Sequence, residues 1–223
     1  MVRISLRSAR ARKLTLAGWM IAASVLWVAA RDFTKPRAQL ATAYPAHDEH
    51  KDEGVAVAVD PYDVPDKAQI FSTNYRADDL LPMFLVITNQ GDEPVSLTSM
   101  KAELVTVNRS KIEASDEDDV FRRLSHPSAS TGPSYPLPLP RKKVKAAVNQ
   151  KTREEVESAR FGAKAVEPHS TQSGFLFFDV AGISTPLAGA HFYLTGLRNA
   201  KGDELMYFEV SMEKSLSSPA AKP

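Results

Sequence analysis

The sequence predicts a mainly β protein in which a β-sandwich is interrupted by a helical and proline-rich insertion and preceded by one transmembrane helix. Short runs of β-branched and aromatic residues recur on both sides of a central stretch, as in the strands of a sandwich. The central stretch, about residues 115–162, is rich in charge and proline instead. Near the N-terminus, an uncharged run follows a basic segment. Together these observations indicate one folded domain with appendages.

The N-terminal segment, residues 1–13, is strongly basic. It carries five arginine and lysine side chains, and the first acidic residue of the chain is Asp32. Residues 14–30 form a run of 17 residues without a charge. As a helix, such a run spans about 25 Å, which is enough to cross a bilayer with help from interfacial side chains. We therefore predict a transmembrane signal anchor at residues 14–30.

The charge on either side of this run predicts where the rest of the chain lies. Because basic flanking segments stay in the cytoplasm, we expect the body on the extracytoplasmic, periplasmic side of the cell membrane, held there by its single helix. The alternative is a cleaved signal peptide with Val28-Ala29-Ala30 as the cleavage site, which would make the body a secreted protein. Both interpretations place the body of the protein outside the cytoplasm.

The composition excludes several classes of site and partner. The chain has 28 basic and 27 acidic side chains, a formal charge of +1. Outside the basic N-terminal segment, 23 bases stand against 27 acids, so the body has a charge of −4. An acidic body without aromatic residues between its bases disfavours nucleic acid as a partner. Because the chain contains no cysteine, it has no disulfide, thiolate metal site or thiol nucleophile.

Residues 31–53 lack apolar periodicity and contain a dense run of charges, which predicts a flexible tether between the membrane and the domain. The folded domain is then expected at residues 54–214. Before the insertion, alternating apolar residues predict strands at 55–59 and 102–107. Residues 81–88 are apolar on both faces, as expected for a strand in the centre of a sandwich.

The insertion is expected to contain two short helices around a proline-rich segment. Ser115 is followed by four acidic residues and, further on, by two arginines, an order that suits the dipole of a capped helix. Residues 126–140 contain five prolines and are expected to be extended. The spacing of Thr152 and Glu155 matches a capping box, and Gly162 suits the end of that second helix.

After the insertion, the strand pattern returns at residues 175–180, 191–197 and 204–212, and residues 215–223 have the composition of a disordered tail. By alternation, three side chains of the last strand are expected on one face: Met206, Phe208 and Val210. The predicted core contains Phe84, Leu85, Phe175, Phe177 and Phe208. Without the insertion the domain has roughly 110 residues, close to the size of an immunoglobulin-like β-sandwich.

Two parts of the sequence resemble the telokin-like, immunoglobulin-related domains of bacterial export proteins. The first comprises residues 84–89, Gly91 and residues 93–95; the second comprises residues 166–170 and leads into residues 174–180. In that family a hydrophobic strand leads to an asparagine turn, and a later proline-marked turn precedes a phenylalanine-rich strand. The resemblance implies an immunoglobulin-like fold and an adhesion, envelope or interaction role, without a catalytic residue. The long insertion departs from the family pattern.

His47 and His50 form the candidate metal site. They stand three residues apart within a run of carboxylates. Imidazole and carboxylate groups together can coordinate Zn²⁺, Ni²⁺ or Cu²⁺. The alternative interpretation of the same run is a solvated part of the tether that binds no metal.

The candidate interaction site is a group of four cations directly after the proline-rich segment: Arg141, Lys142, Lys143 and Lys145. Such a group is suited to contact anionic lipid headgroups, an anionic envelope polymer or an envelope protein, because each base near an anionic surface contributes about 1 kcal/mol. The alternative is a solvated loop whose charge is balanced by the glutamates that follow it.

The motifs of common enzyme classes are absent from the sequence. Ser211 and Lys214 match the S-x-x-K pattern, but its partner motifs do not occur. We therefore predict no enzymatic activity and no cofactor, and expect a membrane-anchored interaction or structural module of the bacterial cell envelope. The alternative is an envelope hydrolase or metal-dependent enzyme whose site is assembled from dispersed histidine, aspartate and glutamate residues.

A third interpretation is a polymer-binding module. It requires an exposed row of aromatic side chains, for which the sequence offers three candidates: Tyr135, Phe161 and Tyr207.

Overall fold

The computed structural model of the chain describes residues 33–125 and 148–216. The predicted anchor at residues 14–30, the whole proline-rich segment at residues 126–140 and the four cations of residues 141–145 lie outside the described residues. Within the part that is described, no helix is long and apolar enough to cross a membrane.

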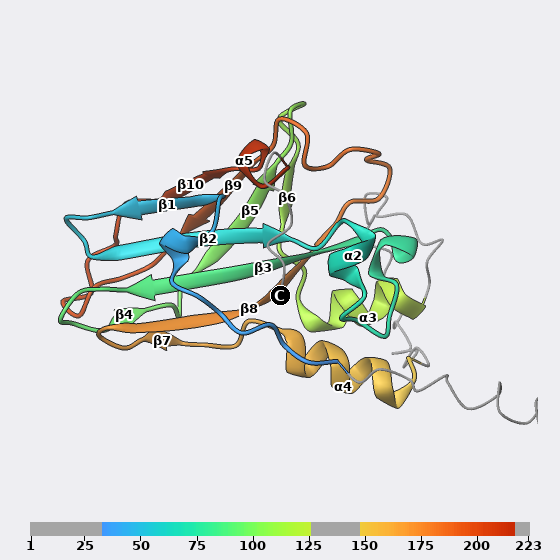
Figure 1. Cartoon of the computed structure of the whole chain (residues 1–223), viewed down its shortest axis with the longest axis horizontal. Helices are drawn as coiled ribbons and strands as arrows, with labels where there is room; N and C mark the ends of the chain where they lie inside the picture. Colours follow the sequence, from blue (N-terminus) through green and yellow to red (C-terminus); the bar gives the residue numbers. More distant parts are fainter. Residues whose placement is uncertain (1–32, 126–147, 217–223) are drawn as a thin grey trace, which may run out of the picture. The chain divides into compact units, whose positions relative to one another are not determined.

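Two four-stranded antiparallel sheets form the centre of the domain (Figure 1). The first sheet has the order β1-β2-β3-β8, with β1 at His47–His50, β2 at Val55–Pro61, β3 at Leu80–Asn89 and β8 at Ser170–Asp179. The second has the order β10-β9-β5-β6, with β10 at Phe208–Ser211, β9 at His191–Thr195, β5 at Lys101–Val105 and β6 at Lys111–Glu113. A short ribbon pairs β4, Val95–Ser96, with β7, Ala165–Val166.

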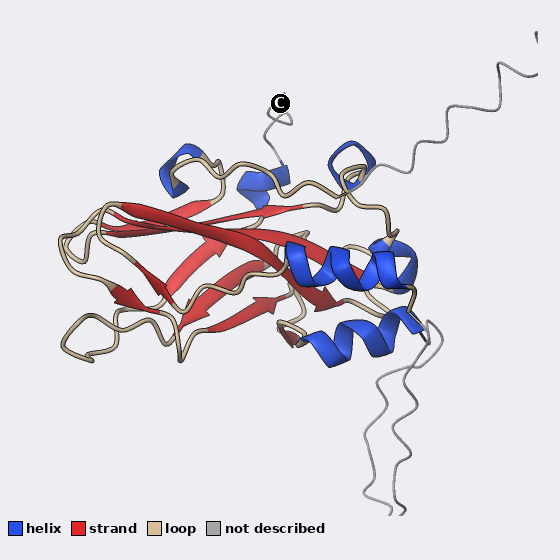
Figure 2. Ribbon diagram, turned by 90° about the horizontal axis from the view of Figure 1, so that it is seen from below, coloured by secondary structure: helices blue, strands red, loops and turns tan. Residues whose placement is uncertain are grey.

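The helices are short. The two longest are α3 at Glu117–Ser125 and α4 at Gln150–Ala159, which lie side by side at one end of the sheets (Figure 2). The others are η1 at Ala41–Ala43, α2 at Pro65–Ala68, η2 at Tyr75–Asp78 and α5 at Glu213–Leu216.

The apolar residues of the first sheet belong to two cores, one on each face. Leu85 of β3 packs between the two sheets together with Phe208 of the second sheet. On the opposite face, Phe84 packs in a second cluster with Phe175 and with Val156 of α4. The predicted core residues are therefore all buried, but they are divided between two cores. Strand β3 is apolar on both faces because the helices cover the face that the second sheet leaves open.

The expectation of a mainly β domain is confirmed, and its two sheets are antiparallel, whereas the order of the strands differs from the immunoglobulin type. In that type the third strand of the chain crosses to the other sheet. Here β1, β2 and β3 follow one another within the first sheet as neighbouring antiparallel strands. The second sheet begins only with β5.

The prediction of a tether over residues 31–53 is wrong for its last part. His47–His50 is a strand that pairs with β2, with His50 opposite Val55. Upstream of it, Ala41 is buried and its backbone amide donates to the Thr88 hydroxyl at 2.9 Å. An edge strand needs only backbone pairing on one side, so polar side chains do not prevent its formation.

The two helices of the insertion are confirmed, with different starting residues. The Asp116 carboxylate, rather than Ser115, accepts a hydrogen bond from the Asp119 amide at the start of α3. Helix α4 begins one turn before the predicted capping box, because the Asn149 side chain accepts from the Thr152 amide at 2.8 Å. Glu155 therefore lies within the helix, where its side chain is free to point inward.

Alternation in the last strand holds for two of the three predicted residues. Phe208 and Val210 are fully buried between the sheets, but Met206 is 62% exposed. Met206 lies before β10 begins, so strand alternation does not apply to it.

Candidate functional sites

The two histidines of the predicted metal site do not face each other. They stand three residues apart in β1, so their side chains leave the strand on opposite faces. The Nδ1 atom of His47 lies 2.6 Å from the Tyr44 carbonyl oxygen. The His50 ring stacks on Phe208, with ring centroids 4.0 Å apart. Among the residues that the structure describes, no group of three or more histidine, cysteine, aspartate or glutamate residues is arranged to hold a metal ion.

The charges around His50 join the edges of the two sheets. The Asp48 carboxylate accepts the backbone amide of Glu209 at 3.0 Å, and the Glu53 carboxylate accepts that of Met206 at the same distance. The Nδ1 atom of His50 lies 2.9 Å from Glu53. These side chains accept one amide of β10, that of Glu209, and one amide of the segment just before it, that of Met206, which gives the charge run a structural role.

The four predicted cations at residues 141–145 and the candidate Tyr135 lie outside the described residues. Of the two other aromatic candidates, Phe161 is buried and Tyr207 is 48% exposed. Ser211 ends β10, and Lys214 lies in the short helix α5 that follows.

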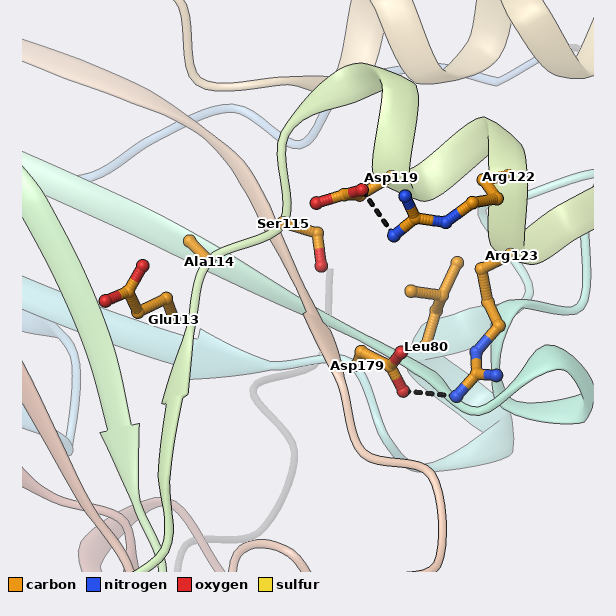
Figure 3. A pocket seen from close by; sticks show the side chains of 8 residues that line it. All are labelled: Leu80, Glu113, Ala114, Ser115, Asp119, Arg122, Arg123 and Asp179. Atoms are coloured by element: carbon orange, nitrogen blue, oxygen red, sulfur yellow. Dashed lines mark hydrogen bonds and ion pairs between the residues drawn. The ribbon is translucent and has the colours of Figure 1, made fainter. Parts of the chain in front are cut away.

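A pocket of about 230 Å³ lies where α3 meets the ends of both sheets (Figure 3). Arg123 is the buried charge in its wall: the side chain is only 5% exposed and lies 2.5 Å from the Asp179 carboxylate. At the rim, Arg122 forms an exposed ion pair with Asp119. The lining residues are Leu80, Glu113, Ala114, Ser115, Asp119, Arg122, Arg123 and Asp179.

The charges in this pocket largely neutralise one another. Three carboxylates face two guanidinium groups, and each guanidinium has a carboxylate within hydrogen-bonding distance. Arg123 also interacts with the Asp78 carboxyl. Burial and the neighbouring Asp79 raise the pKa of Asp78, and the charge of Arg123 opposes that shift. An anion would have to displace a carboxylate of the protein to bind here. The pocket is therefore suited to fixing α3 against β8 more than to capturing an anion.

A buried carboxylate holds the loop before η2 against α4. Glu155 is 3% exposed, and its oxygens accept hydrogen bonds from the Ser72 amide and hydroxyl, both at 2.6 Å. They also accept from the Thr73 amide at 3.3 Å and the Tyr75 hydroxyl at 2.9 Å. Burial, together with this carboxylate, strongly raises the pKa of Tyr75. Tyr75 therefore remains a hydrogen-bond donor well into the alkaline range.

The outer face of the second sheet carries a row of aromatic rings. In β9, Phe192 and Leu194 point into the core, so Tyr193 and His191 point outward and are only half-buried. The Tyr193 ring centroid lies 6.4 Å from that of His191 and 6.1 Å from that of Tyr207. We call His191, Tyr193 and Tyr207 the aromatic row.

Carboxylates flank the aromatic row. Tyr193 lies opposite Glu209 of β10 on one side and Glu103 of β5 on the other. The Tyr193 hydroxyl donates to Glu209 at 2.9 Å, and this hydrogen bond raises the pKa of Tyr193. The outer face therefore combines exposed ring surfaces with hydrogen-bond acceptors.

Reasoning from the sequence found only one member of this row, Tyr207. The signal for the others is the alternation in residues 191–195, where buried Phe192 and Leu194 leave the intervening positions on the solvent side. Which aromatic residues of different strands become neighbours depends on the strand register, which a single sequence does not provide.

No protein-family model matches the chain, and no curated protein matches it. Membership in the telokin-like domains therefore stays a prediction. A proposed lipoprotein, YcdA, from Bacillus subtilis strain 168 is similar in structure, with 15% sequence identity and a TM-score of 0.34. The match covers 72% of this chain and 37% of the Bacillus protein, so the chain spans little more than a third of that protein. A structural genomics target, SoR45, has 12% identity and a TM-score of 0.31 over 78% of this chain and 98% of its own.

Proposed function

We propose that the chain is a membrane-anchored module of the bacterial cell envelope, placed on the extracytoplasmic side, with an interaction or structural role and no catalytic one. The observation that carries this proposal is the N-terminal pattern: a basic segment at residues 1–13 followed by 17 uncharged residues at 14–30. Such a pattern is typical of a signal anchor with its basic end in the cytoplasm.

The arrangement of the sheets supports an interaction role. The first sheet is buried on both faces, between the second sheet and the helices. The second sheet has a core on one face only, and its outer side chains are exposed or half-buried. This outer face offers a rigid surface for a partner, and the four cations of residues 141–145 are a second candidate contact.

Membrane fractionation tests the anchor. We expect the full chain to sediment with membranes and to stay there in alkaline carbonate, because high pH strips proteins held at the membrane surface by polar contacts but does not extract a helix that spans the hydrocarbon core. A variant that lacks residues 14–30 keeps the basic segment and serves as the matched control; it should appear in the soluble fraction. Release of the full chain by carbonate would contradict the anchor, and a mature chain that starts at Arg31 would establish the cleaved signal peptide instead.

A further inference from the structure

We propose that the outer face of the second sheet binds an uncharged glycan chain, whose sugar rings stack on Tyr193 and Tyr207 of the aromatic row. The inference deepens the proposed function and depends on it for the envelope as the place of action. It names the class of partner that this open face recognises.

The shape and exposure of the row suit a chain of sugar rings. Tyr207 is 48% exposed and the neighbouring Met206 is 62% exposed, so apolar surface remains in contact with water here. The ring centroids of Tyr193 and Tyr207 are 6.1 Å apart, a spacing of the order of one sugar unit, and the two ring planes are tilted by 46°, so successive sugar rings would stack at different inclinations. A pyranose ring has an apolar C–H face and a polar rim, which matches an aromatic ring surrounded by hydrogen-bonding groups.

The row is held in place before any ligand binds. The hydroxyl of Tyr193 donates to Glu209, and the Nδ1 atom of His191 lies 2.9 Å from the same carboxylate, without the geometry of a hydrogen bond. Tyr193 and His191 belong to β9, which β10 and β5 flank on either side, and Tyr207 lies directly before the first residue of β10. A rigid platform binds with less loss of conformational entropy than flexible side chains do.

The charges of the face select the type of polymer. Three carboxylates lie on the outward positions of the sheet, Glu103, Glu113 and Glu209, against two lysines, Lys101 and Lys111. Lys111 is within 3.5 Å of Glu103. The net negative charge repels a phosphate-rich or carboxylate-rich polymer, whereas the carboxylate oxygens accept hydrogen bonds from the hydroxyl groups of a neutral glycan.

Calorimetric titration of the detergent-solubilised full chain tests the proposal. The probes are chitohexaose and cellohexaose, two uncharged glycans with extended chains, and inorganic polyphosphate as an anionic polymer. We expect at least one of the two glycans to bind and polyphosphate not to bind. Absence of binding by both glycans at millimolar concentration, or binding of polyphosphate alone at this face, would overturn the proposal.

Variants of the row localise the binding. Removing one ring, as in Tyr193→Ala or Tyr207→Ala, should weaken glycan binding about fivefold or more, since a stacked ring contributes on the order of 1 kcal/mol. Tyr207→Phe keeps the ring and should bind within about threefold of the parent chain. Val64→Ala, at an exposed apolar residue outside the sheets, is the matched control and should leave binding unchanged. Thermal unfolding of each variant verifies that it is folded.

Three further outcomes separate this inference from its competitors. If light scattering shows a dimer that the Tyr193→Ala change dissociates, the face binds a second copy of the chain and the glycan proposal fails. If the chain is anchored outside the cytoplasm but binds neither glycan, the proposed function stands and the ligand class is wrong. Glycan binding by a chain that remains in the cytoplasm would instead contradict the proposed function.

Discussion

Replacing Glu155 with alanine is expected to lower the free energy of unfolding by about 3 kcal/mol. The carboxylate is 3% exposed and accepts four hydrogen bonds, three from the loop before η2 and one from Tyr75, the first residue of η2. Without it, the amides of Ser72 and Thr73 lose a charged partner, and so does the hydroxyl of Tyr75, whose side chain is buried. Hydrogen bonds to a charged acceptor are stronger than neutral ones, and a buried donor without a partner is destabilising.

Urea unfolding of the full chain in mild detergent, followed by circular dichroism, measures this change. Glu154→Ala is the matched control, because Glu154 is the preceding residue of the same helix and its hydrogen bond to Gln150 is exposed. The control should change the free energy of unfolding by less than about 0.5 kcal/mol. Equal effects of the two substitutions would show that the Glu155 network contributes nothing beyond the helix propensity of the residue.

Gly174→Ala is expected to destabilise the domain by about 3 kcal/mol, because β8 and the chain after α4 are in direct contact at this position. A β-carbon on Gly174 would lie 2.5 Å from the Cα atom of Phe161 and 2.8 Å from the carbonyl oxygen of Arg160. Both are backbone atoms, so no side-chain rotation relieves the clash. The Phe161 amide also donates to the Phe175 carbonyl at 2.9 Å, which keeps the two segments together.

Gly162→Ala provides the control for this glycine. It lies next to Phe161 in the same connecting segment, and an added β-carbon would meet no atom within 4 Å. Thermal unfolding should therefore show a large decrease in the melting temperature for Gly174→Ala and almost none for Gly162→Ala. If both variants melt at the same temperature as the parent chain, β8 and the chain after α4 do not lie as close together as the structure places them.

The strands of the fold were largely predictable because their apolar pattern is local. The alternation in β2 and the continuous apolar run in β3 identify these strands without knowledge of their neighbours. The reason for the burial of β3 on both faces was not predictable, because it depends on Val156 and Phe121 of two amphipathic helices far along the chain. Strand β1 was missed because its residues are charged, and its pairing with β2 is made by the backbone alone.

The candidate sites were harder to predict than the fold. Glu155 fits a capping box in the sequence, yet Asn149 caps the helix and Glu155 binds a loop some eighty residues away. The charges around His50 suggest a metal site, but they bind backbone amides of β10 and of the residues just before it. In both cases the polar partner lies far away in the sequence, so local spacing cannot identify it.

The absence of cysteine from the chain allows the proposed topology to be measured directly. Two single-cysteine variants are needed: Lys201→Cys, at an exposed loop position of the domain, and Ser8→Cys, in the basic N-terminal segment. Both are treated in intact spheroplasts with a maleimide that does not cross membranes, and again after lysis. A membrane-anchored extracytoplasmic module should be labelled at position 201 in intact spheroplasts and at position 8 only after lysis. Labelling of position 201 only after lysis would contradict the proposed function.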